Sequence, residues 1–218
     1  MLGCSGGYTS STLQFFIYFG AIEEYFLSYE GKDMMDAEDE VICHDKESGW
    51  SDSLIKISDY GMLSSNTETI KNALIQYGPL PTKMIVYEDF HNSGDVNHYP
   101  DNNYWADNVY YHRFGSYKGL HSVIIVGYRN DGSIRNGGYF ICKNSWGKDW
   151  GLTDNGEKNN GNNGGWFRIS YGTCDIKDDT YYIESISNPS SVPEINAYPD
   201  LNWNGVRVKS TLKDTFTI

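Results

Sequence analysis

The stretch GGYFICKNSWGKDWG, residues 137–151, joins an apolar, strand-like run to an amide and two indoles set among glycines. The apolar run ends at Cys142, and Asn144, Trp146 and Trp150 follow it directly. An amide at the end of a buried strand needs hydrogen-bond partners, because an unpaired buried polar group costs about 1–3 kcal/mol. We therefore expect Asn144 to bind a polar side chain that the fold brings beside it.

His121 is the partner that the sequence offers. It lies directly ahead of the apolar run SVIIVGYRN, residues 122–130, which predicts a buried strand. An asparagine carbonyl that accepts from one ring nitrogen fixes the histidine tautomer and leaves the other nitrogen to act as a base. Trp146 would cover this bond and exclude water from it. The alternative, for His121 taken alone, is a histidine that only anchors the end of a strand.

These segments resemble those of the papain-like, cathepsin-like cysteine peptidases. LHSVIIVGY, YFICKNSWGKDWG and GGWFRIS resemble the C-terminal half of that family, and GCSGGY, SYEG and Cys43 resemble its middle. The resemblance runs over residues 2–186. It implies a cysteine-type peptidase in which His121 is general base and then general acid, Asn144 orients it, and Trp146 is a lid. It implies no cofactor and a polypeptide substrate.

The resemblance also implies the residues that contact the substrate. The backbone of Gly6 and Gly7 would hydrogen-bond an extended peptide, which passes too close to the chain for a Cβ atom. Tyr8 would line a side-chain pocket, and Leu120 would contact the substrate beside the catalytic histidine. Asp179 would lie at the floor of the main specificity pocket and favour Arg or Lys. The alternative for Asp179 is an ordinary surface acid.

The nucleophile of the family is missing, because no C-G-x-C-W occurs among the 218 residues. The family's spacing places that cysteine, and the glutamine of the oxyanion hole, ahead of Met1. We expect the chain to be inactive alone. The resemblance implies that Cys4 and Cys43 are half-cystines that pair with the missing segment. Cys142 is expected to be a small buried hydrophobe, and Cys174 a half-cystine or a core position.

Two helices and several strands are expected. The first helix begins with Thr9 or Ser10 as its cap and ends at Gly20, and the second covers 66–77 with Asn66 or Thr67 as its cap. Strands are predicted over 82–90, 122–130, 138–144, 164–172 and 180–186. With the resemblance, this predicts an α+β, papain-like two-lobed fold with a β-rich C-terminal lobe. It would lack the N-terminal segment and central helix, so we expect marginal stability in residues 1–60.

The chain is expected to divide into a partial peptidase domain, a linker and the start of a second domain, at 1–186, 187–199 and 200–218. The linker is rich in Ser and Pro. The tail resembles the first strands of the immunoglobulin-like β-sandwich domains that are appended to secreted microbial hydrolases. The peptidase resemblance and the implied half-cystines predict an extracellular or cell-surface protein, since disulfides persist in oxidising compartments, with surface attachment through domains that follow the tail. The alternative function is a non-catalytic peptide-binding or adhesion module.

Composition excludes several other classes of function. Acidic residues outnumber basic ones by 29 to 17, so the net charge of −12 disfavours nucleic-acid binding. No apolar run approaches the ~20 residues that a membrane helix needs. No metal site is predicted, since the cysteines form no CxxC pair. His91, His98 and His112 lie in or near one loop without ligand spacing and are expected to be scattered loop histidines. The Asn/Gly-rich residues 153–165 offer Asp154, Asn155 and Glu157 but lack EF-hand spacing, which favours a solvated insertion.

Overall fold

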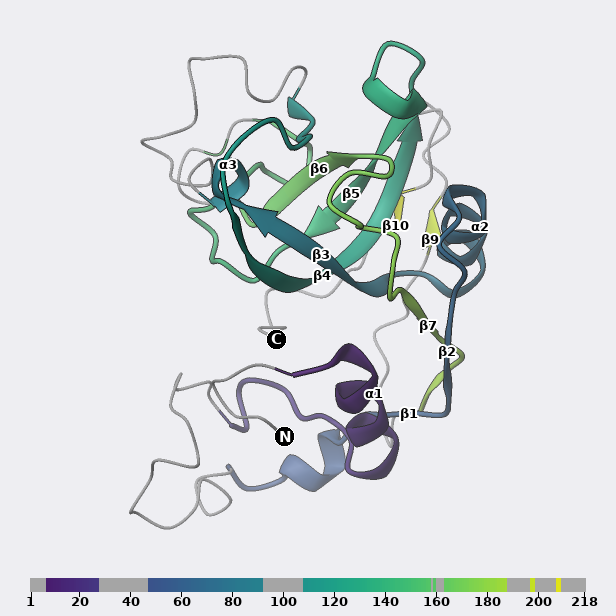
Figure 1. Cartoon of the computed structure of the whole chain (residues 1–218). Helices are drawn as coiled ribbons and strands as arrows, with labels where there is room; N and C mark the ends of the chain where they lie inside the picture. Colours follow the sequence, from purple (N-terminus) through teal and green to yellow (C-terminus); the bar gives the residue numbers. More distant parts are fainter. Residues whose placement is uncertain are drawn as a thin grey trace. The chain divides into compact units, whose positions relative to one another are not determined.

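The computed structural model describes residues 7–27, 47–91, 108–157, 159, 163–187, 197–198 and 207–208. It divides the chain into two compact units: residues 1–61, 183–194 and 211–218 form unit 1, and residues 62–182 and 195–210 form unit 2. The elements follow the order α1 Thr9–Tyr18, η3 Trp50–Ser53, β1 Lys56–Ile57, β2 Tyr60–Met62, α2 Thr67–Tyr77, β3 Leu80–Tyr87, α3 Glu88–His91, β4 Tyr117–Asn130, η6 Arg135–Gly137, β5 Gly138–Lys143, β6 Trp166–Ser170, β7 Tyr181–Ile183, β8 Ile186–Ser187, β9 Ala197–Tyr198 and β10 Arg207–Val208. This mixture of helices and strands agrees with the predicted α+β class (Figure 1).

Unit 1 contains α1, which confirms the first predicted helix but not its predicted cap. The N-cap residue is Tyr8, whose side chain makes no capping bond, and Thr9 begins the helix itself, so the predicted cap is wrong. Gly20 follows the helix at φ +80°, where an added Cβ would lie 2.7 Å from the carbonyl oxygen of Ile55. Only glycine fits this left-handed position, and the helix therefore ends as the sequence predicts.

The second helix, α2, is capped as expected. The side chain of Asn66 accepts hydrogen bonds from the backbone N–H groups of Glu68 (2.9 Å) and Thr69 (3.2 Å). Ile70 and Leu74 are fully buried on the helix face that packs on the core. Asn66 thus satisfies two of the free donors that every helix start presents.

A charged side chain, that of Lys71, is also buried on α2. Its relative exposure is 6%. Its Nζ atom lies 2.7 Å from a carboxylate oxygen of Glu68 and 4.7 Å from the ring centroid of Tyr171. The same Nζ atom lies 5.5 Å from the ring centroid of Tyr128. An ion pair and two aromatic faces offset the loss of water around this ammonium group.

The main sheet of unit 2 is antiparallel and is organised by the long strand β4. Its order is β6-β5-β4-β10-β9, and β3 pairs with β4 as well. The first half of β4 lies against β3, with Met84 opposite His121, and the second half lies against β5, with Lys143 opposite Ile124. In Figure 1, α2 and α3 lie at opposite ends of β3. The pairing carries His121 and the end of β5 to neighbouring places on one sheet.

Two predicted strands need correction. The run over 82–90 forms a strand only to Tyr87, and Glu88–His91 form the short helix α3. Two acids in the first turn favour this helical start over a continued strand. The run over 180–186 divides into β7 and β8, because the two halves pair with different strands, β2 and β1. Strand β6 is shorter than predicted, at Trp166–Ser170.

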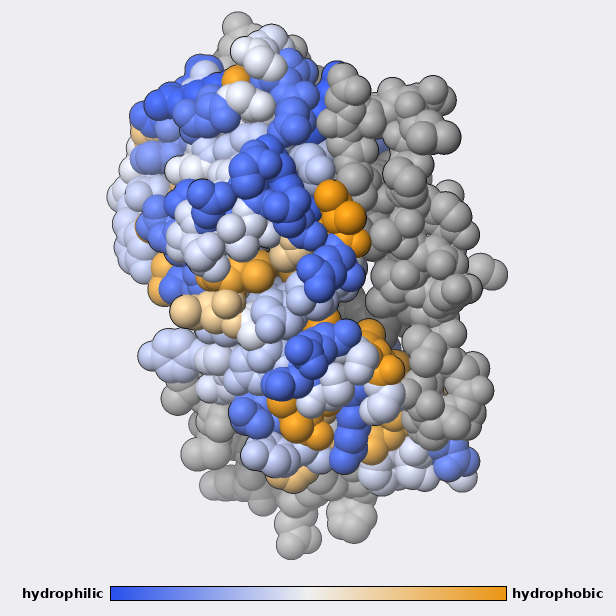
Figure 2. Space-filling model, turned by 90° about the vertical axis from the view of Figure 1, so that its right-hand side faces the viewer, coloured by the Kyte–Doolittle hydropathy of each residue, from blue (hydrophilic) through white to orange (hydrophobic). Residues whose placement is uncertain are grey.

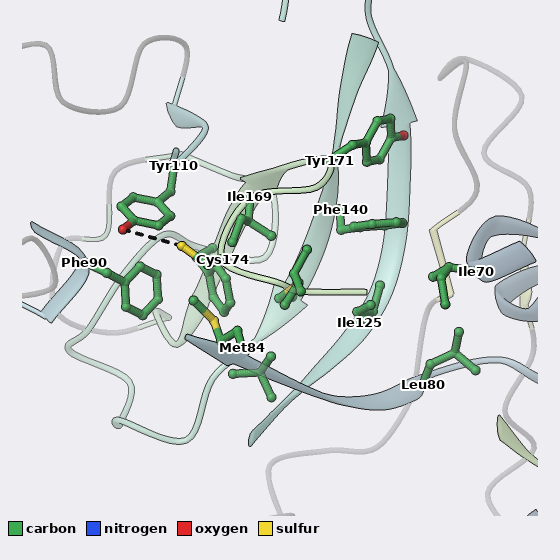
Figure 3. Packing of buried hydrophobic residues seen from close by; sticks show 14 of the residues in the cluster. Ile70, Leu80, Met84, Phe90, Tyr110, Ile125, Phe140, Ile169, Tyr171 and Cys174 are labelled. Carbon is green, nitrogen blue, oxygen red and sulfur yellow. Dashed lines mark hydrogen bonds between the residues drawn. The ribbon is translucent and has the colours of Figure 1, made fainter. Parts of the chain in front are cut away.

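The core of unit 2 lies between β3, β4, β5 and β6 and the segments that follow them. Along β3, buried residues alternate with partly buried ones over the whole strand, which is the period of a strand with one face on a core. Figure 3 shows Phe90, Tyr110 and Cys174 at one end of the cluster and Ile70 and Leu80 at the other. These side chains come from distant parts of the chain, and their burial stabilises unit 2.

Both described cysteines lie inside this core as free thiols. Cys142 is fully buried on β5, which confirms it as a small buried hydrophobe. Of its two alternatives, Cys174 takes the core position, where its Sγ lies 3.9 Å from the hydroxyl of Tyr110. Burial raises the pKa of Cys174 to about 12 and the pKa of Cys142 well above its usual value. Cys4 and Cys43 lie outside the described residues, so their pairing stays a prediction.

The tail after 187 is described only at β9 and β10. These two strands pair with each other, Arg207 opposite Tyr198, and Arg207 also lies opposite Gly127 of β4. Two short paired strands agree with the predicted pair of alternating runs in 200–218 only in part, because β9 begins at Ala197, inside the predicted linker. The separate β-domain stays a prediction.

On the face drawn in Figure 2, hydrophilic residues predominate and the hydrophobic residues form small separate patches. Tyr8, Tyr18, Phe19 and Tyr25 of unit 1 are exposed, whereas Leu13 of α1 is buried. Among the described residues, no helix combines the length and the hydropathy that a bilayer crossing needs. Marginal stability in residues 1–60 stays a prediction.

Candidate functional site

The site is built where β4 passes the end of β5. His121 is partly buried on β4. Asn144 is the first residue after β5, and its backbone N–H donates to the carbonyl of Gly165 at 2.8 Å, which fixes the strand end. The side chain of Asn144 is only 5% exposed. The sheet thus brings together the histidine and the amide that the sequence separates by 22 intervening residues.

The two side chains form a short hydrogen bond. His121 Nε2 lies 2.7 Å from Asn144 Oδ1. The N–H of Ser145 donates to the same Oδ1 at 2.8 Å, so this atom is the amide oxygen and can only accept. Nε2 must therefore carry the ring hydrogen. Nδ1 keeps its lone pair, and none of the described residues forms a hydrogen bond to it, so it is the nitrogen that can take a proton.

The indole of Trp146 packs against the ring of His121. Its ring centroid lies 4.9 Å from that of His121, at an interplanar angle of 31°. Burial lowers the pKa of His121 below its usual value of 6.5, and the hydrogen bond to Asn144 opposes this shift only in part. The imidazole is therefore neutral at pH 7, which is the state that a general base requires.

Two buried N–H groups at the site have no acceptor among the described residues: Nδ2 of Asn144 and Nε1 of Trp150. An unpaired buried donor costs about 1–3 kcal/mol. Asn144 therefore contributes less to the stability of the fold than a fully paired amide would. The hydrogen bonds of the Asn144 side chain are thus made through Oδ1, the atom that orients His121.

The other predicted site residues lie in different surroundings. Gly7 and Tyr8 belong to unit 1, where a Cβ on Gly7 would meet no atom within 4 Å and Tyr8 is 70% exposed. Gly6 lies outside the described residues. Leu120, beside His121 on β4, is exposed. The carboxylate of Asp179 already has two partners, Lys83 and Tyr181.

Asp179 lies in unit 2 in a left-handed backbone conformation, at φ 59°. Its carboxylate is 3.3 Å from the ammonium of Lys83 and accepts a hydrogen bond from the hydroxyl of Tyr181 at 2.7 Å. It is therefore neither a fully solvated surface acid nor an unpartnered pocket acid. A basic substrate side chain would have to share this carboxylate with Lys83.

Sequence reasoning missed Asp89. Read as part of a strand over 82–90, this residue falls on the partly exposed face, yet on α3 its side chain is only 4% exposed. It binds the hydroxyl of Tyr110, Nδ1 of His112 and two backbone N–H groups. His112, expected to be a scattered loop histidine, is one of these partners. The acidic pair at 88–89 directly after a strand-like run was the signal available for a helix start.

No metal site is found among the residues that the structure describes: no three His, Cys, Asp or Glu side chains there could hold an ion together. In the Asn/Gly-rich insertion, Asp154 and Glu157 are described, whereas 158 and 160–162 are not. The guanidinium of Arg168 donates to the carbonyl of Asn155 at 3.0 Å, which ties the insertion to β6.

Comparisons with known proteins agree with this geometry. Residues 1–184 match the family described as papain family cysteine protease. Cathepsin B-like CP1 of Giardia intestinalis is 32% identical over 187 residues, which cover 83% of this chain and 52% of that protein. Cathepsin J of Mus musculus is 28% identical over 156 residues, or 69% of this chain and 40% of that protein. The chain thus spans about half or less of the length of these relatives.

Solved structures share the fold. A procathepsin B from Trypanosoma congolense has a TM-score of 0.54 at 19% identity, covering 85% of this chain and 53% of that one. The clostridial cysteine protease Cwp84 has a TM-score of 0.56 at 21% identity, covering 85% of this chain and 42% of that one. These likenesses show that the described chain has the papain-like fold.

Proposed function

Since the chain belongs to the papain family of cysteine proteases, we propose that His121 and Asn144 form the base half of a peptidase that hydrolyses extended polypeptides by a Cys–His–Asn mechanism. The observation that carries the proposal is the 2.7 Å bond from His121 Nε2 to Asn144 Oδ1. It leaves Nδ1 as the basic nitrogen. A neutral amide orients the ring without adding charge to it.

In the proposed reaction, Nδ1 of His121 takes the proton of a cysteine thiol. The thiolate attacks the carbonyl carbon of the scissile bond, and the imidazolium then protonates the leaving amine. Water, deprotonated by the same nitrogen, hydrolyses the acyl-enzyme and returns the thiol. Through both steps Asn144 holds the ring, and Trp146 keeps water away from the bond that orients it.

The nucleophilic thiol is proposed to come from a segment of the full gene product ahead of Met1. The two described cysteines do not suit the role, because burial raises the pKa of both Cys142 and Cys174 and a thiolate is needed. No C-G-x-C-W occurs in the 218 residues. We therefore propose that these residues hydrolyse no peptide by themselves.

Substrate contacts are proposed at Gly6, Gly7, Tyr8 and Leu120. Asp179 is proposed to select Arg or Lys in the substrate, with Lys83 as a competing cation 3.3 Å from its carboxylate. Exchange of Asp179 for Asn should reduce cleavage of Arg-containing peptides relative to Leu-containing ones in the full gene product. Equal Arg-to-Leu ratios before and after the exchange would remove Asp179 from the specificity site.

The proposed function is tested on the full gene product with fluorogenic peptides. His121→Ala should lower kcat/KM by about 10²–10⁴-fold, the usual contribution of a general base. Ser122→Ala, at the exposed neighbour on the same strand, is the matched control and should leave kcat/KM unchanged. A His121→Ala variant as active as the unaltered protein would refute the assignment.

The coding DNA on the 5′ side of the Met1 codon provides a second, independent test. An in-frame C-G-x-C-W supports the peptidase. Its absence, together with peptide binding that proceeds without hydrolysis, would favour the alternative of a non-catalytic peptide-binding or adhesion module. In the 218-residue chain alone, Cys142 and Cys174 should bind no thiol-directed epoxide probe, because both thiols are buried.

We also propose a secreted or cell-surface protein whose peptidase domain, 1–186, is followed by a linker at 187–199 and a β domain that begins at 200–218. The antiparallel pairing of β9 with β10 supports a β-rich tail. The pairing of Arg207 with Gly127 of β4 argues against a tail that folds as an independent domain. Limited proteolysis decides between them: cleavage confined to 187–199 favours the separate domain, and a resistant linker favours a tail that belongs to the main sheet.

A further inference from the structure

We propose that Asp89 is a positioning residue for the His121–Asn144 pair: it fixes α3 against the segment that leads into β4 and thereby seats Phe90 beneath Trp146. The inference rests on the proposed function, because it assigns a task to Asp89 within that site. Asp89 touches neither His121 nor Asn144 in the contacts described above, so its action runs through other residues.

The first step is the carboxylate itself. One oxygen of Asp89 accepts from the hydroxyl of Tyr110 at 2.8 Å and lies 3.1 Å from Nδ1 of His112. The other accepts from the backbone N–H groups of Arg113 at 2.9 Å and Phe114 at 3.4 Å. Two oxygens that only accept can serve four donors at once, which an amide cannot do because one of its two ends donates.

The second step leads from this segment to β4. Glu88, next to Asp89, accepts from the hydroxyl of Ser116 at 3.1 Å, and its backbone N–H donates to the carbonyl of Ser116 at 3.0 Å. An added Cβ on Gly115 would lie 2.7 Å from the Cβ of Glu88, so the turn passes very close to α3. Strand β4 begins at Tyr117, directly after this contact, and carries His121.

The third step leads from α3 to the indole over the site. Phe90 is fully buried, and its ring centroid lies 5.6 Å from that of Trp146 and 5.4 Å from that of Trp150. It also meets the ring of Tyr110 at 4.9 Å, the tyrosine whose hydroxyl binds Asp89. Figure 3 shows Phe90 and Tyr110 side by side at one end of the core. Asp89 and Phe90 are adjacent on a helix of four residues, so fixing one fixes the other.

The arrangement explains why a buried carboxylate lies here. A buried acid that only stabilised the fold would have no bearing on Trp146. Here the same short helix contacts the start of the strand that carries His121 and the indole that covers it. Loosening Asp89 should therefore let water reach the bond between His121 and Asn144.

The test uses NMR of the full 218-residue chain and follows the Nε2 hydrogen of His121. In Asp89→Asn, solvent exchange of this hydrogen should accelerate by about tenfold or more, because the covering indole opens more often. Phe90→Leu should produce the same acceleration. Asp131→Asn makes the same chemical change at a carboxylate whose partners, Ser133 and Arg129, both lie within two residues of it, and exchange should stay as in the unaltered chain.

A second control separates positioning from simple loss of stability. Thr82→Val removes a buried hydroxyl that binds the carbonyl of Ile176 and the hydroxyl of Thr180. It should lower the melting temperature without accelerating the exchange at His121. If Asp89→Asn or Phe90→Leu leaves the exchange unchanged, or if Thr82→Val accelerates it as much, the inference is refuted.

These outcomes are distinguishable from failure of the proposed function. The exchange measurement needs no nucleophile and no substrate, so it reports on the geometry of the pair alone. If exchange responds as expected while His121→Ala leaves peptide hydrolysis by the full gene product intact, Asp89 positions a pair that is not catalytic. In that case the function fails and the structural link stands.

Discussion

Among the described side chains of unit 2, His121 and His112 each meet a single acceptor, and the two acceptors differ in charge. His121 donates from Nε2 to the neutral amide of Asn144 beneath an indole. His112 lies 3.1 Å from the buried carboxylate of Asp89 and stacks on Tyr87, with ring centroids 3.6 Å apart. The first acceptor binds one side chain, and the second gathers four donors.

The difference indicates two separate uses of the same side chain. A carboxylate accepts from several donors at once, so it is suited to holding structure. An amide fixes the ring but leaves its proton affinity low, so the free nitrogen can take up and return a proton near neutral pH. Substitutions of the two acceptors, Asp89 and Asn144, should therefore change different properties of the protein.

The largest expected effect is on stability, at Asp89. Asp89→Ala should lower the free energy of unfolding by about 3–5 kcal/mol, because it leaves several buried donors without an acceptor. Asn144→Ala should cost less, about 1–2 kcal/mol, since it removes the acceptor of only two donors, on His121 and Ser145. Urea denaturation measures both. Equal losses at the two positions would contradict the division of roles.

The next effect is on the charge of His121. Asn144→Asp converts the neutral acceptor into a carboxylate and should raise the pKa of His121 by about 1–3 units. The pH titration of the ring by NMR measures the shift. Asn130→Asp, which adds the same charge at an exposed position at the end of β4, should leave the titration of His121 where it was. If the pKa of His121 does not rise in Asn144→Asp, the neutral charge of the amide has no effect on the proton affinity of the ring.

The smallest effect is the pH dependence that His121 gives to folding. Its pKa in the folded chain is lowered, mainly by burial, below the usual value of 6.5. Between the two values the unfolded chain binds more protons than the folded one, so stability falls as the pH drops through 6.5 toward the folded pKa. His121→Gln should flatten this part of the curve. Urea unfolding at successive pH values measures it, and a slope that survives the exchange must come from other groups.

The proximity of His121, Asn144 and Trp146 could be predicted because these residues are neighbours in the sheet. Asn144 and Trp146 follow one strand, and His121 lies on the strand that pairs with it, so motif and pairing agree. The first helix was also predicted, but Tyr8 rather than Thr9 occupies its N-cap, because no side chain there reaches a backbone N–H. Such a cap is set by local backbone geometry that composition does not reveal.

Asp89 could not be predicted in the same way. Its donors, on residues 110–114, come some twenty residues later, after a long polar stretch, and nothing in the local pattern pairs them with it. A strand assignment over 82–90 also placed Asp89 on the wrong face. Long-range hydrogen bonds to backbone N–H groups depend on how the chain returns, and side-chain type alone carries no information on that return.

Lys71 on α2, with its amine enclosed by Glu68, Tyr128 and Tyr171, is a natural reporter for chemical footprinting. An amine-reactive reagent meets the exposed lysines of the native protein readily, whereas this one becomes accessible only when the helix lifts from the sheet. Mass spectrometry of a single tryptic peptide would then register that motion without any engineered label.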